Sequence, residues 1–166
     1  QQPGLLDLAE ALGDILPHAA LIGQLATEGD PFAGALAHQI ERALGHADAR
    51  VDSFVFGTRL THTTRLMRQR DPDQAIGQVS REVEDWAGGT RISACLHAFN
   101  RDWARRVLGQ GAVVLLITDG LDRDEGGDLG REMERLHLSS RRLIWINPLL
   151  RWDGFAPKAG GGAVLG

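Results

Sequence analysis

The sequence contains a single cysteine, Cys95, which excludes any disulfide bond within the chain. It also lacks an uninterrupted run of the roughly 18–20 apolar residues that a membrane-spanning helix needs. The N-terminal stretch QQPGLLDLAEALGDIL carries acidic residues and no basic leader, unlike a secretory signal peptide. Together these absences predict a cytoplasmic protein that does not associate with a membrane.

An excess of positive charge is absent as well. Lys and Arg total 18 against 22 Asp and Glu, which gives a formal net charge of −4 at pH 7. Such a chain has no global field that would attract nucleic acid or an anionic membrane. Arginines do cluster in residues 101–106 and at Arg141 and Arg142, but acidic residues are interspersed along the same stretches. We therefore interpret these clusters as solvated faces.

The common catalytic and cofactor motifs are missing. No G-x-G-x-x-G, no phosphate-binding G-x-x-x-x-G-K-[ST] and no G-x-S-x-G nucleophile turn occurs in the chain. The histidines show no metal-ligand spacing. Cys95 and His97 are two residues apart and do not face each other on a helix. We expect Cys95 to be a small buried hydrophobe, as most free cysteines are.

Apolar residues, by contrast, are plentiful. The chain has 166 residues and is 43% hydrophobic, enough for one domain with a core. Three short apolar runs predict buried strands at residues 19–22, 112–117 and 143–146. Residues 51–67 are rich in β-branched and aromatic side chains and predict two more strands, the second at a sheet edge.

Amphipathic helical spacing separates these strands. Apolar residues recur at helical intervals within residues 5–15, 32–44, 76–86, 92–107 and 129–136, and Thr90 occupies a predicted capping position. Apolar strands alternating with such helices predict a doubly wound α/β fold, whose mostly parallel sheet is covered on both faces.

In open parallel sheets, ligands bind beyond the carboxyl ends of the strands, where the strand order reverses. The predicted loops at that edge are GQLATEGD, AGGT and TDG. Asp119 in the last loop directly follows a buried strand. It is interpreted either as a ligand in the crevice or as the start of an ordinary Asp-Gly turn. The order of strands, hairpin and loops favours the ligand.

Four stretches resemble the von Willebrand factor A (VWA) fold and, more narrowly, its bacterial CoxE-like branch. These stretches are VDSFVFGTRLTHTTRLM, WAGGTRISACLHAFNRDW, GAVVLLITDGLDR and RLIWINPLL. The resemblance covers about residues 18–155, which leaves an N-terminal helix at 1–17 and a flexible glycine-rich tail at 156–166. It implies one antiparallel edge strand in a parallel-dominated sheet. It also implies a metal-ion-dependent adhesion site built from Asp-x-Ser-x-Ser, a threonine and an aspartate.

That implied metal site is degenerate in this chain. Thr90 matches the family threonine and Asp119 the family aspartate, but Gln24, Ala26 and Glu28 stand where Asp, Ser and Ser are expected. Mg²⁺ requires near-octahedral oxygen ligands at about 2.0–2.1 Å, and Ala26 offers none. We expect Thr90, Asp119 and Glu28 to bind Mg²⁺ or Mn²⁺ weakly or not at all, and we expect no other cofactor.

The resemblance implies a non-catalytic, protein-binding adaptor. Its CoxE-like relatives are associated with MoxR-type AAA+ ATPases in the maturation of carbon monoxide dehydrogenase and related metalloenzymes. The candidate partner-binding residues are Gln24, Glu28, Trp86, Thr90, Asp119 and Asp122. Two alternatives stay open. One is a metal-dependent binding module in which Glu28 rebuilds the site, and the other is a small hydrolase that uses Asp119 with a histidine from another loop.

Trp152 in the C-terminal loop could serve as an exposed interface anchor, whereas Trp103 and Trp145 are expected to pack in the core. The acidic stretch 122–128 is interpreted as a solvated helix N-terminus, with a rim that selects a basic partner as the alternative.

Overall fold

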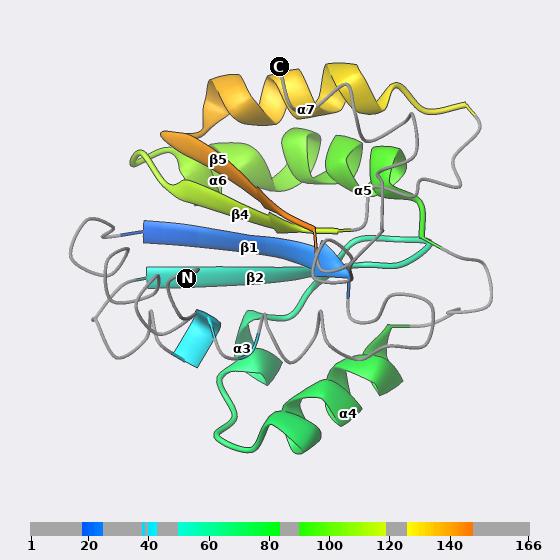
Figure 1. Ribbon diagram of the computed structural model, residues 1–166, viewed down its shortest axis with the longest axis vertical. Coiled ribbons are helices and arrows are strands. Elements are labelled where there is room, and N and C mark those ends of the chain that lie inside the picture. Colours follow the sequence, from blue (N-terminus) through cyan, green and yellow to red (C-terminus); the bar gives the residue numbers. More distant parts are fainter. Residues whose placement is uncertain are drawn as a thin grey trace, which may run out of the picture.

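The computed structural model describes residues 18–24, 38, 40–42, 50–83, 90–118 and 126–147. Five strands form one mixed sheet in the order β3-β2-β1-β4-β5 (Figure 1). The strands are β1 (His18–Gln24), β2 (Arg50–Phe56), β3 (Thr61–His62), β4 (Val113–Ile117) and β5 (Arg142–Ile146). All pair in parallel except β3, which runs antiparallel to β2 at the edge. The predicted sheet and its antiparallel edge strand are confirmed.

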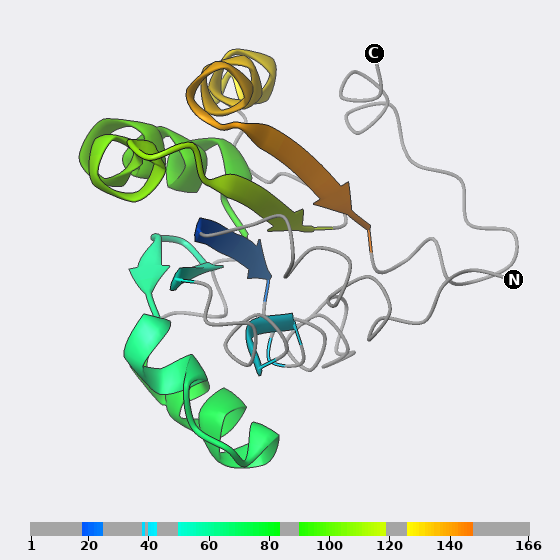
Figure 2. The ribbon, with the colours of Figure 1, turned by 90° about the vertical axis from the view of Figure 1, so that its left-hand side faces the viewer.

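Helices cover both faces of the sheet (Figures 1 and 2). One face carries α5 (Ile92–Ala98), the π-helix η2 (Phe99–Trp103), α6 (Ala104–Leu108) and α7 (Leu129–Ser139). The other carries α3 (Thr64–Met67) and α4 (Pro72–Glu82). Successive strand residues point to opposite faces, so each buried strand contributes side chains to the core on both faces of the sheet. In β4, Val114 and Leu116 pack toward α5–α7, whereas Leu115 and Ile117 pack on the opposite side.

The second strand of the predicted hairpin is shorter than expected. Thr61 and His62 pair with β2, but the chain then turns into α3. The Thr63 N–H donates to Ser53 O at 2.8 Å, and the Ser53 N–H donates to Thr64 Oγ1 at 3.0 Å. A threonine hydroxyl thus takes the place of the next strand carbonyl, which ends the ladder despite the high strand propensity of this segment.

The long helix predicted after residue 90 forms with two differences. A π-helix at Phe99–Trp103 interrupts it, and the N-cap position is held by Arg91, with no side-chain hydrogen bond. The prediction that Thr90 caps this helix is therefore wrong by one residue. The Arg91 N–H instead donates to Gly57 O at 3.1 Å, which attaches the helix start to the end of β2.

The predicted N-terminal helix at 1–17, most of the stripe at 32–44 and the tail at 156–166 lie outside the described residues, so the proposed domain boundaries stay predictions. Within the described part of the chain, no helix is both long and apolar enough to span a membrane.

Candidate functional site

The carboxyl ends of the four parallel strands meet at one edge of the sheet. The register pairs Gln24 with Phe56, Gly23 with Ile117, and Ile117 with Ile146. From β1 the chain continues to β2 on one side, while β4 pairs on the other side, so the strand order reverses between β1 and β4. This reversal is where open α/β sheets bind ligands, and it is the edge predicted from the sequence.

At this reversal point β1 and β4 approach very closely. A Cβ atom added to Gly23 would lie 2.9 Å from both Cβ and O of Ile117. Real Cβ atoms do not approach backbone this closely, so only glycine fits at position 23. The loop that follows β1 therefore starts from a tightly fixed strand end.

Thr90 is half-buried and lies beside the end of β2. Its neighbour Arg91 is bonded to Gly57 O, and the Cys95 Sγ also donates to that carbonyl at 3.5 Å. Cys95 is buried, as predicted, and His97 contacts Glu132 instead. The glycine at 57 thus joins the β2 end to the helix that follows the AGGT loop.

The chain that leads into Asp119 is fixed by two hydrogen bonds. The Thr118 N–H donates to Ile146 O at 3.1 Å, and the Thr118 carbonyl accepts the Trp145 Nε1–H at 3.0 Å. Trp145 also packs against the larger core, as expected, and so does Trp103. Sequence reasoning missed the bond to Thr118, although a half-buried indole N–H generally requires an acceptor.

The remaining predicted site residues lie outside the description. They are Ala26, Glu28, Trp86, Asp119, Asp122 and Trp152, and for Gln24 only the backbone is described. The structure therefore brings Gln24, Thr90 and Thr118 to one edge through three neighbouring strands. The arrangement of the carboxylates beyond them stays a prediction.

The side chains expected at this edge from the sequence do not fit a complete magnesium site. If Gln24, Ala26 and Glu28 take the three positions of the family motif, they offer one amide oxygen, no ligand atom and one carboxylate. Octahedral Mg²⁺ sites need several well-placed oxygens. Among the described residues, no group of three or more His, Cys, Asp or Glu side chains could hold a metal ion.

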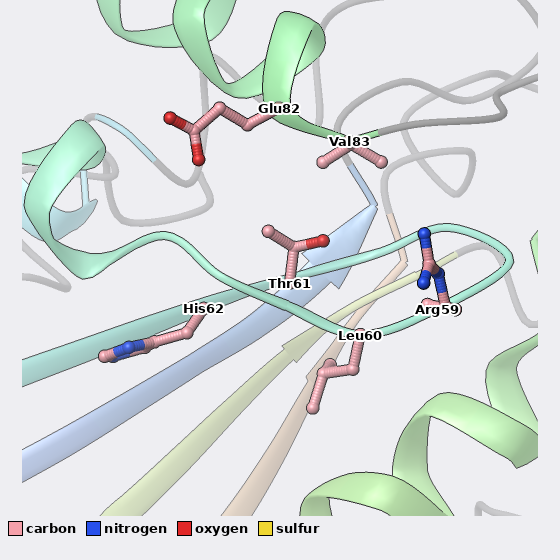
Figure 3. A pocket seen from close by; sticks show the side chains of 6 residues that line it. All are labelled: Arg59, Leu60, Thr61, His62, Glu82 and Val83. Carbon is pink, nitrogen blue, oxygen red and sulfur yellow. The ribbon is translucent and has the colours of Figure 1, made fainter.

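A cavity of about 400 Å³ lies beside the β2–β3 connection (Figure 3). Thr61 and His62 of the edge strand line it together with Glu82 and Val83 at the end of α4. Arg59 and Leu60 complete the lining. This cavity was not predicted from the sequence, because its walls come from a turn and a helix end that only the fold brings together.

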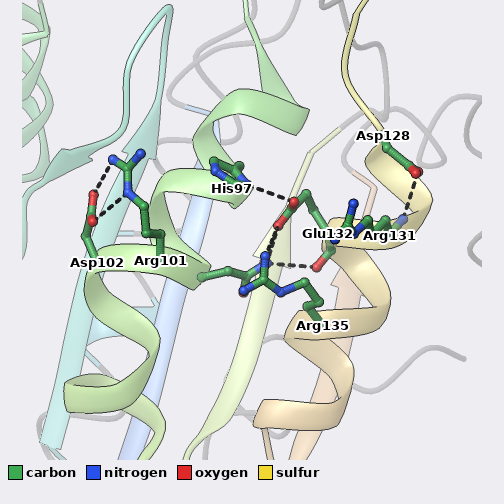
Figure 4. A network of polar contacts seen from close by, with 8 residues as sticks. His97, Arg101, Asp102, Asp128, Arg131, Glu132 and Arg135 are labelled. Carbon is green, nitrogen blue, oxygen red and sulfur yellow. Dashed lines mark hydrogen bonds and ion pairs between the residues drawn. The ribbon is translucent and has the colours of Figure 1, made fainter.

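A second polar group, centred on Glu132, links η2 to α7 (Figure 4). Glu132 is 6% exposed. Its carboxylate accepts hydrogen bonds from His97 Nδ1 at 2.9 Å and Asn100 Nδ2 at 2.8 Å. Burial alone would raise the pKa of Glu132, but these bonds and the nearby Arg135 hold the pKa below its ordinary value.

This buried glutamate was detectable in the sequence. Glu132 is three residues after Leu129 and four before Leu136, on the same inward stripe of α7. Asp128 caps α7 by accepting the Arg131 N–H at 3.0 Å, which agrees with the helix N-terminus expected there.

Comparison with known families agrees with this architecture. The family described as "VWA domain containing CoxE-like protein" matches residues 33–166, whereas comparison with curated proteins finds no match. The matched range includes β2–β5 and Thr90 but begins after β1, so Gln24 is placed by the sheet topology alone, and the position of Glu28 stays a prediction. From both the sheet and the match, the chain belongs to the CoxE-like VWA domain family.

Proposed function

We propose that this CoxE-like VWA domain is a non-catalytic adaptor. It binds a MoxR-type AAA+ ATPase and brings to it a client metalloenzyme of the carbon monoxide dehydrogenase kind. The observation that carries the proposal is that Gln24, Thr90 and Thr118 all lie at the carboxyl edge of a VWA sheet, at the ends of the neighbouring strands β1, β2 and β4.

Partner binding at this edge would differ from that of an intact family site. In intact sites, a carboxylate of the partner completes the coordination of the metal. Here Glu28 and Asp119 would present carboxylates without a firmly held metal, and Thr90 would add a hydroxyl. Such a surface favours a basic or hydrogen-bond-donating group of the partner. Trp86 and Asp122 would lie at its rim.

The proposal is tested by measuring the affinity of the purified chain for the ATPase. Asp119→Ala and Thr90→Ala should each weaken binding by about tenfold or more if these residues contact the partner centrally. Asp73→Ala serves as the matched control, because Asp73 is an exposed carboxylate far from the candidate site. It lies in the first turn of α4, whereas the other end of that helix, at Val83, contacts Gly57 at the end of β2. Equal affinities for all three variants would contradict the proposal.

A calorimetric titration with Mg²⁺ and Mn²⁺ separates the proposal from the metal-dependent alternative. We expect no binding in the micromolar range and no effect of a chelator on partner affinity. Micromolar binding that is lost in both Asp119→Ala and Glu28→Ala would show instead that Glu28 rebuilds the site. A hydrolytic activity abolished by a histidine substitution would contradict the non-catalytic assignment.

A further inference from the structure

Two arginine pairs that are distant in sequence meet at the amino edge of the sheet, opposite the candidate site. Arg105 and Arg106 lie in the last turn of α6. The Arg141 N–H donates to Ala112 O at 2.9 Å, and Arg142 pairs with Val113 at the start of β4. Because α6 leads into β4 through a short turn, both pairs lie at the same end of the molecule (Figure 1). We call these four arginines the basic edge.

The basic edge is exposed and lacks acidic partners among the described residues. All four side chains are exposed, and no carboxylate in the described ranges forms an ion pair with them. The nearest acid in sequence, Asp102, pairs with Arg101 at 2.8 Å. Within the described part of the chain, the acids interspersed with these four arginines therefore form no ion pair with them.

Arginines outnumber acids in the described residues around the basic edge. Residues 90–118 and 126–147 contain 8 arginines, no lysine and 4 carboxylates, within a chain whose net charge is −4. The intervening residues 119–125 add four acids and one arginine, and they follow Thr118 at the carboxyl end of β4, the opposite end from the basic edge. A local cluster of arginines creates a field that a net-charge estimate conceals.

One member of the basic edge is held in place by aromatic rings. The Arg106 guanidinium lies 4.6 Å from the centroid of the Trp103 ring. Trp103 in turn contacts His62 and Phe54, with ring centroids 4.6 and 5.1 Å away. An arginine stacked on a packed tryptophan has lost part of its conformational freedom before binding, so less is lost when a ligand arrives.

We propose that the basic edge binds a carboxylate-rich segment of a partner protein. Arginine guanidinium groups pair with carboxylates in a bidentate manner, and several exposed guanidinium groups that form no ion pair with a described carboxylate favour a run of Asp and Glu. An oligonucleotide is the competing polyanion, but Trp103, the aromatic ring beside Arg106, is already stacked by the Arg106 guanidinium and packed on Phe54 and His62, which leaves it less available to stack on a base. This surface is independent of the proposed adaptor site, since it lies at the other end of every parallel strand.

The test uses a fluorescently labelled oligoglutamate peptide and measures its anisotropy with the full chain. Binding should be detectable in about 50 mM salt and should weaken markedly in about 200 mM salt, because the contacts are charge pairs. The triple substitution Arg105→Glu, Arg141→Glu and Arg142→Glu should weaken binding by about tenfold or more. Arg106 is left intact so that its packing on Trp103 is preserved.

The matched control reverses Arg65, Arg70 and Arg81, three exposed arginines of the α3–α4 region, and so changes the net charge equally. Circular dichroism verifies that both variants fold. Undetectable binding of the peptide in low salt overturns the proposal, and so does an equal loss in the control variant. Tighter binding of a single-stranded oligonucleotide of the same charge also overturns it, in favour of a polyphosphate ligand.

Discussion

Two buried glutamates show how differently one residue type titrates within a single small domain. Glu41 and Glu132 are 5% and 6% exposed. Burial raises the pKa of Glu41, and the charges of Arg68, His38 and Arg42 offset this only in part. Around Glu132, direct hydrogen bonds outweigh burial and lower the pKa. Hydrogen-bond donors that reach the carboxylate therefore decide whether burial raises its pKa or the pKa falls.

Substitution of Glu132 by Gln should destabilise the protein at neutral pH. The folded-state pKa of Glu132 lies below its ordinary value of 4.5, so its ionised form adds stability that is present above that value. Two charge-assisted hydrogen bonds become neutral ones, and we expect a loss of about 1.5–3 kcal/mol in the free energy of unfolding. Chemical denaturation as a function of pH measures this loss, which should shrink as the pH falls through the folded-state pKa.

Glu41→Gln is the matched control for this experiment. Since burial raises the pKa of Glu41, its contribution to stability is present below the ordinary value of 4.5 and is lost as the pH rises through the folded-state pKa. This variant should therefore be at least as stable as the parent at pH 7. If Glu41→Gln lost as much stability as Glu132→Gln, the opposite directions of the two pKa shifts would be contradicted.

At the scale of elements, the contact between β1 and β4 depends on one missing side chain. Gly23→Ala places a methyl group 2.9 Å from Ile117 Cβ and O, and the central strands cannot separate without breaking their ladder. We expect a loss of about 1–3 kcal/mol in the free energy of unfolding, as in other overpacked cores. Thermal and urea unfolding measure it.

The control is Gly77→Ala within α4. Its added methyl group would meet only the end of the Arg81 side chain, at 3.9 Å. Alanine is the better helix former, so this variant should gain about 0.5–1 kcal/mol. If both variants lost similar free energy of unfolding, the close approach of Gly23 to Ile117 would not explain the cost of Gly23→Ala.

Element by element, the sequence predicted what depends on local pattern. Apolar runs located β1, β4 and β5 to within three residues, and helical spacing located α4 and α7. The errors arose where a distant group decided the outcome. The strand β3 ends early because the Ser53 N–H donates to the Thr64 hydroxyl. The helix start differs from the predicted one where the Arg91 N–H donates to the Gly57 carbonyl.

For the candidate site, the sequence predicted only the residues that match the family motif. Thr90 and Asp119 could be aligned with family positions, because their loops have a recognisable composition. The bond from Trp145 to Thr118, and the bond from Arg141 to Ala112, could not be predicted. Both depend on β5 lying next to β4, and strand order is a property of the whole sheet.

At the scale of the whole molecule, the two helical layers differ in how firmly they are held. Among the described residues, the α5–α7 layer packs on an extensive core that includes Phe54, Phe99 and Leu116, whereas the α3–α4 layer packs on a small cluster around Val55 and Val79. Regions with few buried apolar contacts open at lower free energy. We therefore expect α3 and α4 to unfold locally before the rest of the domain.

Hydrogen exchange followed by mass spectrometry checks this expectation. Amides of α4 should exchange at least about tenfold faster than those of β4 and α5 under native conditions. The measurement has an internal reference, because β4 is buried along its full length. Uniform protection across both layers would show that the domain opens as a single unit.

The central position of β1 also constrains how the protein is made. Its two neighbours are β2, which begins at residue 50, and β4, which begins at residue 113. During synthesis the chain leaves the ribosome from its N-terminus, so β1 and β2 can pair while β4 has yet to be translated. Throughout that interval the other edge of β1 lacks the strand that completes it, and its apolar residues Ala20 and Ile22 lack the α5–α7 layer. A nascent chain of this domain is therefore a natural client for chaperones that shield unpaired strands.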